Sequence, residues 1–305
     1  MIFKKTTEIK FSNYYKKLNI LSLILIILSV LILLFKGLNF GVDFKGGTLI
    51  EIRTENSKIG ISEIRQSFTK MNLGDVNVKK FGKENDYLVK IENTKSEDEN
   101  FIESINKKLS SDLGSTVNFR RVEKVGPKVS KELLKDGLLA ITLSLAAMLF
   151  YIWIRFEWQF SLGAIAALIH DVIITIGIFS LLSYEVNLSI VAAVLTIVGY
   201  SMNDTVVIFD RIRENLKKYS KILIGDISNI STNETLSRTL ITSVTTLLAL
   251  LSIYIFGGEI LKGFSFAMIV GVIVGTYSSI FVATPILNYT KVNQKTVLKD
   301  NIDGP

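Results

Sequence analysis

The chain has 305 residues, 49% of them in the hydrophobic set, and a mean hydropathy of +0.40. This apolar content is unusual for a soluble domain. The formal charge is +7, and the sequence contains no cysteine and one histidine, His170. These counts exclude disulfides, cysteine-based metal sites and sites with two or more histidines, so no metal or other cofactor is expected.

Six apolar blocks lie along the chain, each about 17–25 residues long, which a helix needs to cross a ~30 Å hydrocarbon core. They are residues 18–35, 138–154, 160–182, 188–208, 240–256 and 264–288. The first block follows a basic segment, as in a signal peptide, but its apolar run is longer and no small-x-small cleavage site follows it. We therefore expect a retained first helix and a polytopic membrane protein with six transmembrane helices.

Basic residues flank alternate ends of these blocks. The N-terminal arm, the segment DRIRENLKKYSK and the final tail are basic, whereas the link SYEVN has no Lys or Arg. Because short cytoplasmic segments are enriched in Lys and Arg, both termini are expected in the cytoplasm. These flanks account for most of the net charge, so the basic pI does not indicate nucleic-acid binding. The expected layout is 1–36 arm and first helix, 37–136 outward domain, 137–290 helices two to six, and 291–305 tail.

The outward segment has ordinary soluble composition and is long enough for one small domain. The expected elements are strand 48–54, helix 62–72 with Ser62 as N-cap, strands 76–81 and 87–92, helix 96–113 and strand 115–122. The β-α-β-β-α-β order predicts a small α+β ferredoxin-like domain. It has no catalytic pattern, and the chain has no Gly-Lys-Ser/Thr phosphate loop, so ATP is not the expected energy source. Contact with a partner or substrate chain is the expected role, and the glycines of GVDFKGG are expected in a turn that needs positive φ.

One carboxylate lies inside the fourth apolar block. Asp204 follows Asn203 and shares a helix face with Ile208 and Arg211, at spacings of four and three. A membrane carboxylate that alternates between water and an arginine, such as Arg238 before the fifth block, can take up and release a proton. Hydrogen bonding between helices is the alternative, and we favour proton or ion handling.

Other polar residues in or beside the blocks allow two interpretations. His170 and Asp171, in the middle of the third block, are either part of a proton relay or a polar pair that links helices. Asp210 and Arg211 lie at the end of the fourth block, where anchoring at the membrane interface explains them as well as chemistry does. Arg238 can also be a flanking residue whose side chain reaches the interface.

Small residues recur at intervals of four in the sixth block. Ala267, Gly271 and Gly275 are followed by Ser279. Such a row lets helix backbones approach closely, so it predicts a packing face rather than a binding site.

Five motifs, in chain order, resemble the SecD/SecF family of the resistance-nodulation-division superfamily, and its SecF branch in particular. The motifs are GVDFKGGTLIEI (41–52), VGPKVSKELLKDGLLA (125–140), LIHDVIITIGIFSL (168–181), GYSMNDTVVIFDRIREN (199–215) and SRTLITSVTTLLALL (237–251). The resemblance covers nearly all of the chain. Lys45 departs from it, because a small residue is expected between Phe44 and Gly46.

The resemblance implies a non-enzymatic subunit of protein export in the bacterial inner membrane. The six helices would form half of a resistance-nodulation-division transporter and pair pseudo-symmetrically with six of SecD. Together with YajC, the pair would work beside the SecYEG channel and use the proton-motive force to help a preprotein complete translocation. Asp204 and Arg238 would belong to the proton path at the SecD interface, with Thr242 and Thr245 as polar neighbours, and His170–Asp171 matches the family's third-helix polar pair.

Two alternatives belong to other functional classes. One is half of a proton-coupled exporter for lipids or small molecules, although such proteins usually have twelve helices in one chain and much larger outward domains. The other is a passive scaffold of the translocon, which the sequence barely separates from a proton-coupled subunit. The expected proton relay comprises Asp204, Arg238, Asp171 and His170, supported by Asn203, Thr242, Thr245, Asp210 and Arg211.

Overall fold

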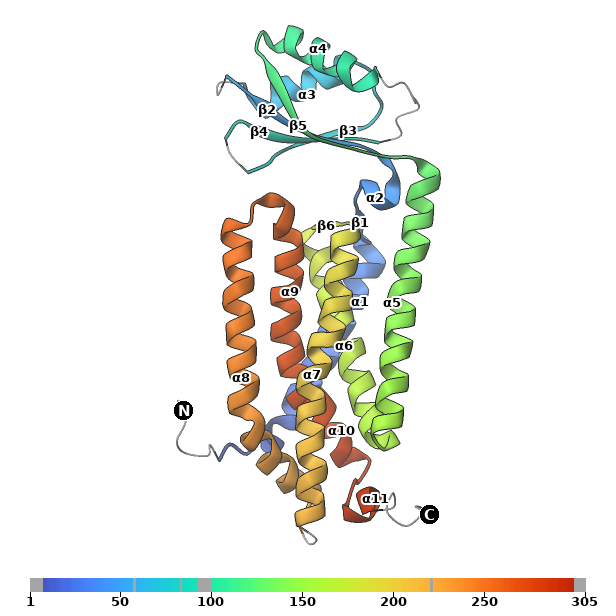
Figure 1. Ribbon diagram of the computed structural model, residues 1–305, viewed down its shortest axis with the longest axis vertical. Helices are drawn as coiled ribbons and strands as arrows, with labels where there is room; N and C mark the ends of the chain where they lie inside the picture. Colours follow the sequence, from blue (N-terminus) through green and yellow to red (C-terminus); the bar gives the residue numbers. More distant parts are fainter. Residues whose placement is uncertain (1–7, 57–58, 83, 93–99, 220–221, 299–305) are drawn as a thin grey trace. The chain divides into compact units, whose positions relative to one another are not determined.

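The computed structural model describes residues 8–56, 59–82, 84–92, 100–219 and 222–298. The described residues fall into two compact units (Figure 1). One unit takes the described residues of the ranges 1–39, 140–184 and 189–305 and contains the membrane helices, except for the first residues of two of them. The other draws on 40–139 and 185–188 and contains a four-stranded sheet.

Within the described residues, six helical segments are long and apolar enough to cross a membrane. They are η1–α1 (Phe11–Tyr14, Tyr15–Lys36), α5 (Pro127–Arg155), α6 (Trp158–Leu182), α7 (Leu188–Lys218), α8 (Ile224–Phe256), and α9 (Glu259–Ser278) continued by η2 (Ser279–Ala283) and α10 (Thr284–Tyr289). The prediction of a polytopic helical membrane protein is thereby confirmed. A short helix, α11 (Gln294–Leu298), follows α10.

Several helices extend beyond the apolar blocks. Helix α5 begins at Pro127, eleven residues before the block that starts at 138, and α7 continues to Lys218, ten residues past 208. Helix α8 begins at Ile224, sixteen residues before 240. Apolar composition marks only the part of a helix that crosses lipid, whereas Lys, Glu and Leu in the flanking turns are good helix formers. The expected boundary at residue 136 therefore falls inside α5.

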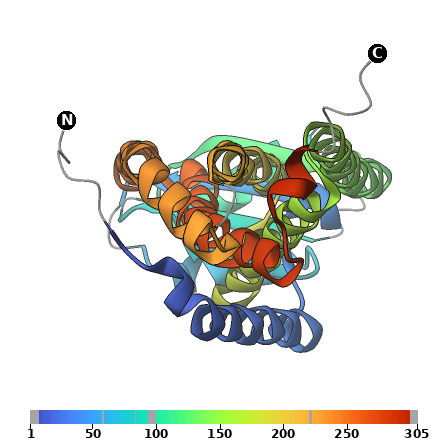
Figure 2. The same ribbon diagram turned by 90° about the horizontal axis from the view of Figure 1, so that it is seen from below.

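Helices α6, α7 and α9 form the centre of the membrane unit. In each of them, 50% of the residues in an apolar stretch of 18 residues are buried within the chain, against 11–17% in α1, α5 and α8. In the view of Figure 2, α1 and α5 lie at the periphery of the helices. Any group that joins α6, α7 and α9 therefore lies in the interior of the unit.

The second unit has the element order expected from the sequence. Strands β2 (Gly47–Thr54), β3 (Val76–Lys80), β4 (Asp86–Ile91) and β5 (Val117–Val125) accompany helices α3 (Ile61–Lys70) and α4 (Phe101–Leu113). The antiparallel sheet has the order β3-β4-β2-β5, which is the order of a split βαβ fold. Ile50, Ile52, Val89, Phe68 and Leu109 are fully buried where the two helices cover one face of the sheet (Figure 1).

Two details of this unit differ from the expectations. Ser62 is not the N-cap of α3, because the helix begins at Ile61 and Gly60 caps it. The Glu63 carboxylate, in the first turn, reaches back to accept the Gly60 N–H at 2.8 Å, as the N3 acid of a capping box does. Helix α4 is described from Phe101, and the expected start of that helix, at 96–99, lies outside the described residues.

The segment GVDFKGG contains a short helix, α2 (Val42–Lys45), followed by two glycines in the left-handed half of φ space. Gly46 has φ +78° and Gly47 φ +124°, which confirms the expected positive φ, whereas Gly41 is extended. A Cβ on Gly47 would collide with the carbonyl oxygen of Ile91 on β4. Next to α2, β1 (Asn39–Phe40) pairs with β6 (Glu185–Val186).

We predict that Gly47→Ala destabilises the sheet by roughly 1–3 kcal/mol, because alanine is strained at this φ and its methyl group meets fixed backbone. Amide hydrogen exchange of β2 and β4 in the full-length protein measures the effect. Gly37→Ala is the matched control, since Gly37 also has positive φ (+69°) but a Cβ there meets nothing within 4 Å. Equal protection of the sheet in Gly47→Ala and in the unmodified chain would contradict this prediction.

Candidate functional site

Helices α7 and α9 meet along the predicted row of small residues. A Cβ on Gly275 would lie 2.9 Å from the Cβ of Ser201, and a Cβ on Gly271 would overlap the side chain of Ile197. The contacting positions recur every four residues on both helices, so the two backbones run side by side through this region. The prediction of a packing face over 267–279 is confirmed, and we call this contact the α7–α9 seam.

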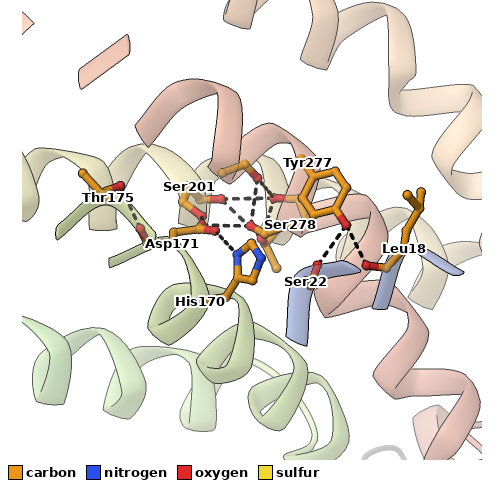
Figure 3. A network of polar contacts seen from close by, with 11 residues as sticks. Leu18, Ser22, His170, Asp171, Thr175, Ser201, Tyr277 and Ser278 are labelled. Atoms are coloured by element: carbon orange, nitrogen blue, oxygen red, sulfur yellow. Dashed lines mark hydrogen bonds and ion pairs between the residues drawn. The ribbon is translucent and has the colours of Figure 1, made fainter. Parts of the chain in front are cut away.

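On one side of the seam, a single carboxylate joins three helices (Figure 3). Asp171 of α6 is fully buried, and its Oδ2 accepts the Ser201 hydroxyl of α7 at 2.5 Å and the Ser278 hydroxyl of α9 at 2.8 Å. Its Oδ1 lies 2.8 Å from Nδ1 of His170. Both carboxylate oxygens thus have partners, as a buried charged or polar group requires.

The same network reaches the first helix through an aromatic ring. The His170 ring stacks on Tyr277 of α9, with 6.0 Å between centroids and 26° between planes. The Tyr277 hydroxyl donates to the Leu18 carbonyl of α1 at 2.8 Å and lies 2.8 Å from the Ser22 hydroxyl (Figure 3). His170 Nε2 is buried and has no hydrogen-bond partner among the described residues.

Below these residues the seam ends in a turn of π-helix, η2. The hydroxyls of Thr205 and Ser279 lie 2.8 Å apart across the seam, and the Thr284 hydroxyl donates to the Ser279 carbonyl at 2.8 Å. A Cβ on Gly163 of α6 would lie 2.7 Å from the carbonyl oxygen of Ala283. π-Helical turns inside α-helices occur frequently at functional sites, and this one adjoins the buried polar network.

Asp204 lies on the other side of the seam, towards α8. It is 4% exposed, and its Oδ2 has no hydrogen-bond partner among the described residues. The Thr276 hydroxyl of α9 lies within hydrogen-bonding reach of the carboxylate, and Arg238 of α8 acts on it through its charge. The Thr276 hydroxyl in turn lies 2.8 Å from the Ser243 hydroxyl of α8. Asp204 therefore has polar neighbours but, unlike Asp171, keeps one buried oxygen unbonded.

The remaining α8 candidates flank this carboxylate without bonding to it in the described structure. Arg238 is exposed and forms no salt bridge with Asp204 within the described residues. Thr242 donates to the Arg238 carbonyl at 3.1 Å, and Thr245 donates to a carbonyl of its own helix at 2.8 Å. Asn203, next to Asp204 on α7, is exposed.

Two candidates at the end of the fourth block are held in ion pairs away from Asp204. Asp210 pairs with Arg155 of α5 at 3.0 Å. Arg211 pairs with Glu214 at 2.7 Å and with Glu234 of α8 at 2.7 Å. These contacts tie the helix ends together, so they favour anchoring over a role in proton movement.

The hydroxyl groups of the site were not recognised in the sequence. Ser201 and Ser278 lie 30 and 107 residues from Asp171 along the chain, and no local motif connects them. Thr276 and Ser243 likewise come from different helices. A usable signal did exist, because serines lie on or beside the four-residue row of small side chains, where a hydroxyl can reach a neighbouring helix.

The arrangement matches a known family. The family model described as protein export membrane protein SecD/SecF, C-terminal, matches residues 105–293, and the model described as SecD/SecF GG motif matches residues 31–58, which include Gly46 and Gly47. The chain belongs to the SecD/SecF family. Residues 105–293 contain four of the five motifs in full, and therefore both membrane carboxylates, Asp171 and Asp204.

Relatives of similar length carry one name. The protein translocase subunit SecF of Rickettsia bellii is 45% identical over 92% of each chain. That of Cereibacter sphaeroides is 43% identical over 93% of this chain and 90% of its own. That of Calditerrivibrio nitroreducens is 43% identical over 96% and 98%.

Solved structures agree in fold. The crystal structure of SecDF, a translocon-associated membrane protein from Thermus thermophilus, superposes with a TM-score of 0.84 at 34% identity. A SecDF structure in a super-membrane-facing form gives a TM-score of 0.70 at 33% identity. Each match covers 93% of this chain, and this chain spans 39% of the SecDF chain.

We predict that Gly275→Ala lowers the free energy of unfolding by about 1–3 kcal/mol, because the seam leaves no room for a methyl group against the Ser201 Cβ. Thermal unfolding of the purified protein in detergent measures the loss. Gly199→Ala, on α7 where a Cβ meets nothing within 4 Å, is the control and should unfold at or above the parent temperature. A Gly275→Ala protein as stable as Gly199→Ala would show that the seam is looser than described.

Proposed function

We propose that this chain is a subunit of a bacterial protein-export complex and that proton uptake at Asp204 couples the proton-motive force to export. Membership of the SecD/SecF family and relatives that are named protein translocase subunits support the export role. The observation that carries the coupling is the buried Asp204 carboxylate, which has an unbonded oxygen inside a membrane span. Ionisable groups at such depth are costly and mark ion or proton paths.

The proposed site is completed by another chain. Arg238, Asn203 and Thr245 are exposed in this chain, although they lie within helices that cross the membrane. Polar and charged side chains that face hydrocarbon are costly, so a protein surface or water path should cover this side of α7 and α8. SecDF, of which this chain spans 39%, supports a SecD-like partner that contributes the missing part.

The proposed coupling step is a change of charge at one position. A charged Asp204 attracts the Arg238 guanidinium across the α7–α8 contact, and protonation removes that attraction. In the proposed complex a partner surface covers Arg238, which strengthens this attraction, so its loss on protonation would favour movement of α8 relative to α7. The proton enters on the side where the partner admits water and leaves on the opposite side, so each cycle converts proton movement into helix movement.

Family membership supports a proposal for the wider assembly. We infer an inner-membrane location with both termini in the cytoplasm and the domain 37–136 in the periplasm, which the basic flanks support. YajC, the SecYEG channel and the translocating preprotein are the further partners we infer. A lipid or small-molecule exporter has less support, because the named relatives are translocase subunits.

We predict that Asp204→Asn abolishes the stimulation of preprotein release by the proton-motive force, because the amide cannot exchange a proton, while the complex still assembles. Inverted membrane vesicles, assayed with and without a protonophore, measure the stimulation. Asp210→Asn is the matched control, a carboxylate on the same helix that is already held in an ion pair, and it should retain the stimulation. Normal stimulation in Asp204→Asn would favour a passive scaffold.

We also predict that Arg238→Met causes the same loss as Asp204→Asn, because it removes the cation that responds to the charge of Asp204. The double variant should lose no more than either single variant, as expected for two residues that act as one unit. The same vesicle assay applies, and Arg238→Lys should retain part of the stimulation since it keeps a positive charge. Normal export by Arg238→Met would refute the pairing.

A further inference from the structure

Two buried carboxylates flank the α7–α9 seam from opposite sides, and their bonding differs. Asp171 has a partner on each oxygen and holds a serine of α7 and a serine of α9. Asp204 has a buried oxygen without a partner among the described residues. A group that exchanges protons needs a free position, whereas a group whose acceptor sites are filled from three helices is suited to hold them in place.

We propose that Asp171 is a positioning residue, a clasp that fixes the rotation of α7 against α6 and α9 and thereby sets the surroundings of Asp204. The proposal rests on the proposed function of Asp204. It assigns His170–Asp171 a part in the site that differs from carrying the transported proton.

Ser201 links Asp171 to the rotation of α7. Its hydroxyl donates to Asp171 Oδ2 at 2.5 Å, while its Cβ packs against Gly275 with no space for a further methyl group. Ser201 is therefore held from two directions at once. Asp204 follows it by three residues, less than one helical turn, so a rotation of α7 at Ser201 turns the Asp204 carboxylate by the same angle.

Ser278 links Asp171 to the position of α9. Its hydroxyl donates to the same oxygen of Asp171 at 2.8 Å. One atom of α6 therefore binds both α7 and α9. Thr276, two residues earlier on α9, interacts with Asp204 on the opposite side of the seam. The clasp thus sets the position of both the carboxylate and one of its polar neighbours.

The groups around Asp171 fit a fixed role. The titratable side chains that face it are His170 on its own helix, 2.8 Å away, and Tyr277 of α9, which stacks on the His170 ring and is bonded to α1. The other facing polar groups are the two serine hydroxyls. The serine hydroxyls, the Tyr277 hydroxyl and His170 Nδ1 each bond to another helix or to the carboxylate, so both oxygens of Asp171 are occupied, whereas His170 Nε2 has no partner among the described residues.

The test measures Asp204 directly in the full-length protein within its export complex. Dicyclohexylcarbodiimide modifies protonated carboxyl groups in apolar surroundings, and mass spectrometry of the modified peptide reports the rate at Asp204. The variants are Ser201→Ala and Ser278→Ala, each of which removes one hydroxyl and keeps a good helix former. We expect each to change the modification rate of Asp204 by roughly 2- to 30-fold, the range typical of coupling between neighbouring sites, and to reduce the stimulation of export by the proton-motive force.

Two controls separate positioning from general stability. Thr175→Val removes a buried hydroxyl one turn from Asp171 that donates to the Asp171 backbone carbonyl rather than to its carboxylate, and it should leave the Asp204 rate unchanged. Ser278→Thr keeps the hydroxyl and should restore the parent rate. Asp171→Asn is the more drastic variant, and the two serine variants decide the question if it fails to fold.

The outcomes distinguish this proposal from the one on which it rests. An unchanged Asp204 rate in both serine variants, even with reduced thermal stability or export, overturns the clasp and leaves the role of Asp204 intact. Normal proton-motive-force stimulation in Asp204→Asn overturns the coupling role itself.

Discussion

Close contact between α7 and α9 is the constraint on which the rest of the membrane unit depends. Glycines at 271 and 275 remove the side chains that would separate the two helices, so Ile197 and Ser201 lie against bare backbone. In lipid, where apolar surface gains little from mutual burial, such packing and the hydrogen bonds across it provide much of the force between helices. The seam also determines which residues of α7 face α6 and which face α8, and hence the surroundings of each carboxylate.

The two acids illustrate how a membrane interior separates two tasks. Asp171 is fully buried, and two serine hydroxyls and the His170 ring nitrogen Nδ1 lie within 2.8 Å of its carboxylate. Asp204 has a free oxygen and a cation on the neighbouring helix. Burying a polar group with all its bonds made stabilises a single arrangement, whereas burying one with an unmet bond stores free energy that a proton or a moving helix can release. We infer that export uses the second kind of site and depends on the first to hold it.

Much of the architecture was predictable from the sequence because it follows from local physical rules. Apolar runs of span length indicated six helices, and alternating strands and amphipathic helices indicated the β-α-β-β-α-β domain. Helix ends were less predictable: Pro127, Lys218 and Ile224 lie far outside the apolar blocks. The N-cap at Ser62 was wrong because the helix begins at Ile61, with Gly60 as its N-cap and the Gly60 N–H bonded to the Glu63 carboxylate.

Their positions in apolar runs already placed Asp204 and Asp171 inside spans, and the small-residue row at 267–279 indicated close packing. The contacts of each acid, in contrast, depend on how the helices pack. The serine partners of Asp171 lie 30 and 107 residues away along the chain. Arg211, which was expected on the face of Asp204, forms ion pairs with Glu214 and Glu234 instead. A helical period fixes which residues share a face, but not the angle at which that face meets its neighbours. That angle is set by the α7–α9 seam, which brings together residues that no local pattern connects.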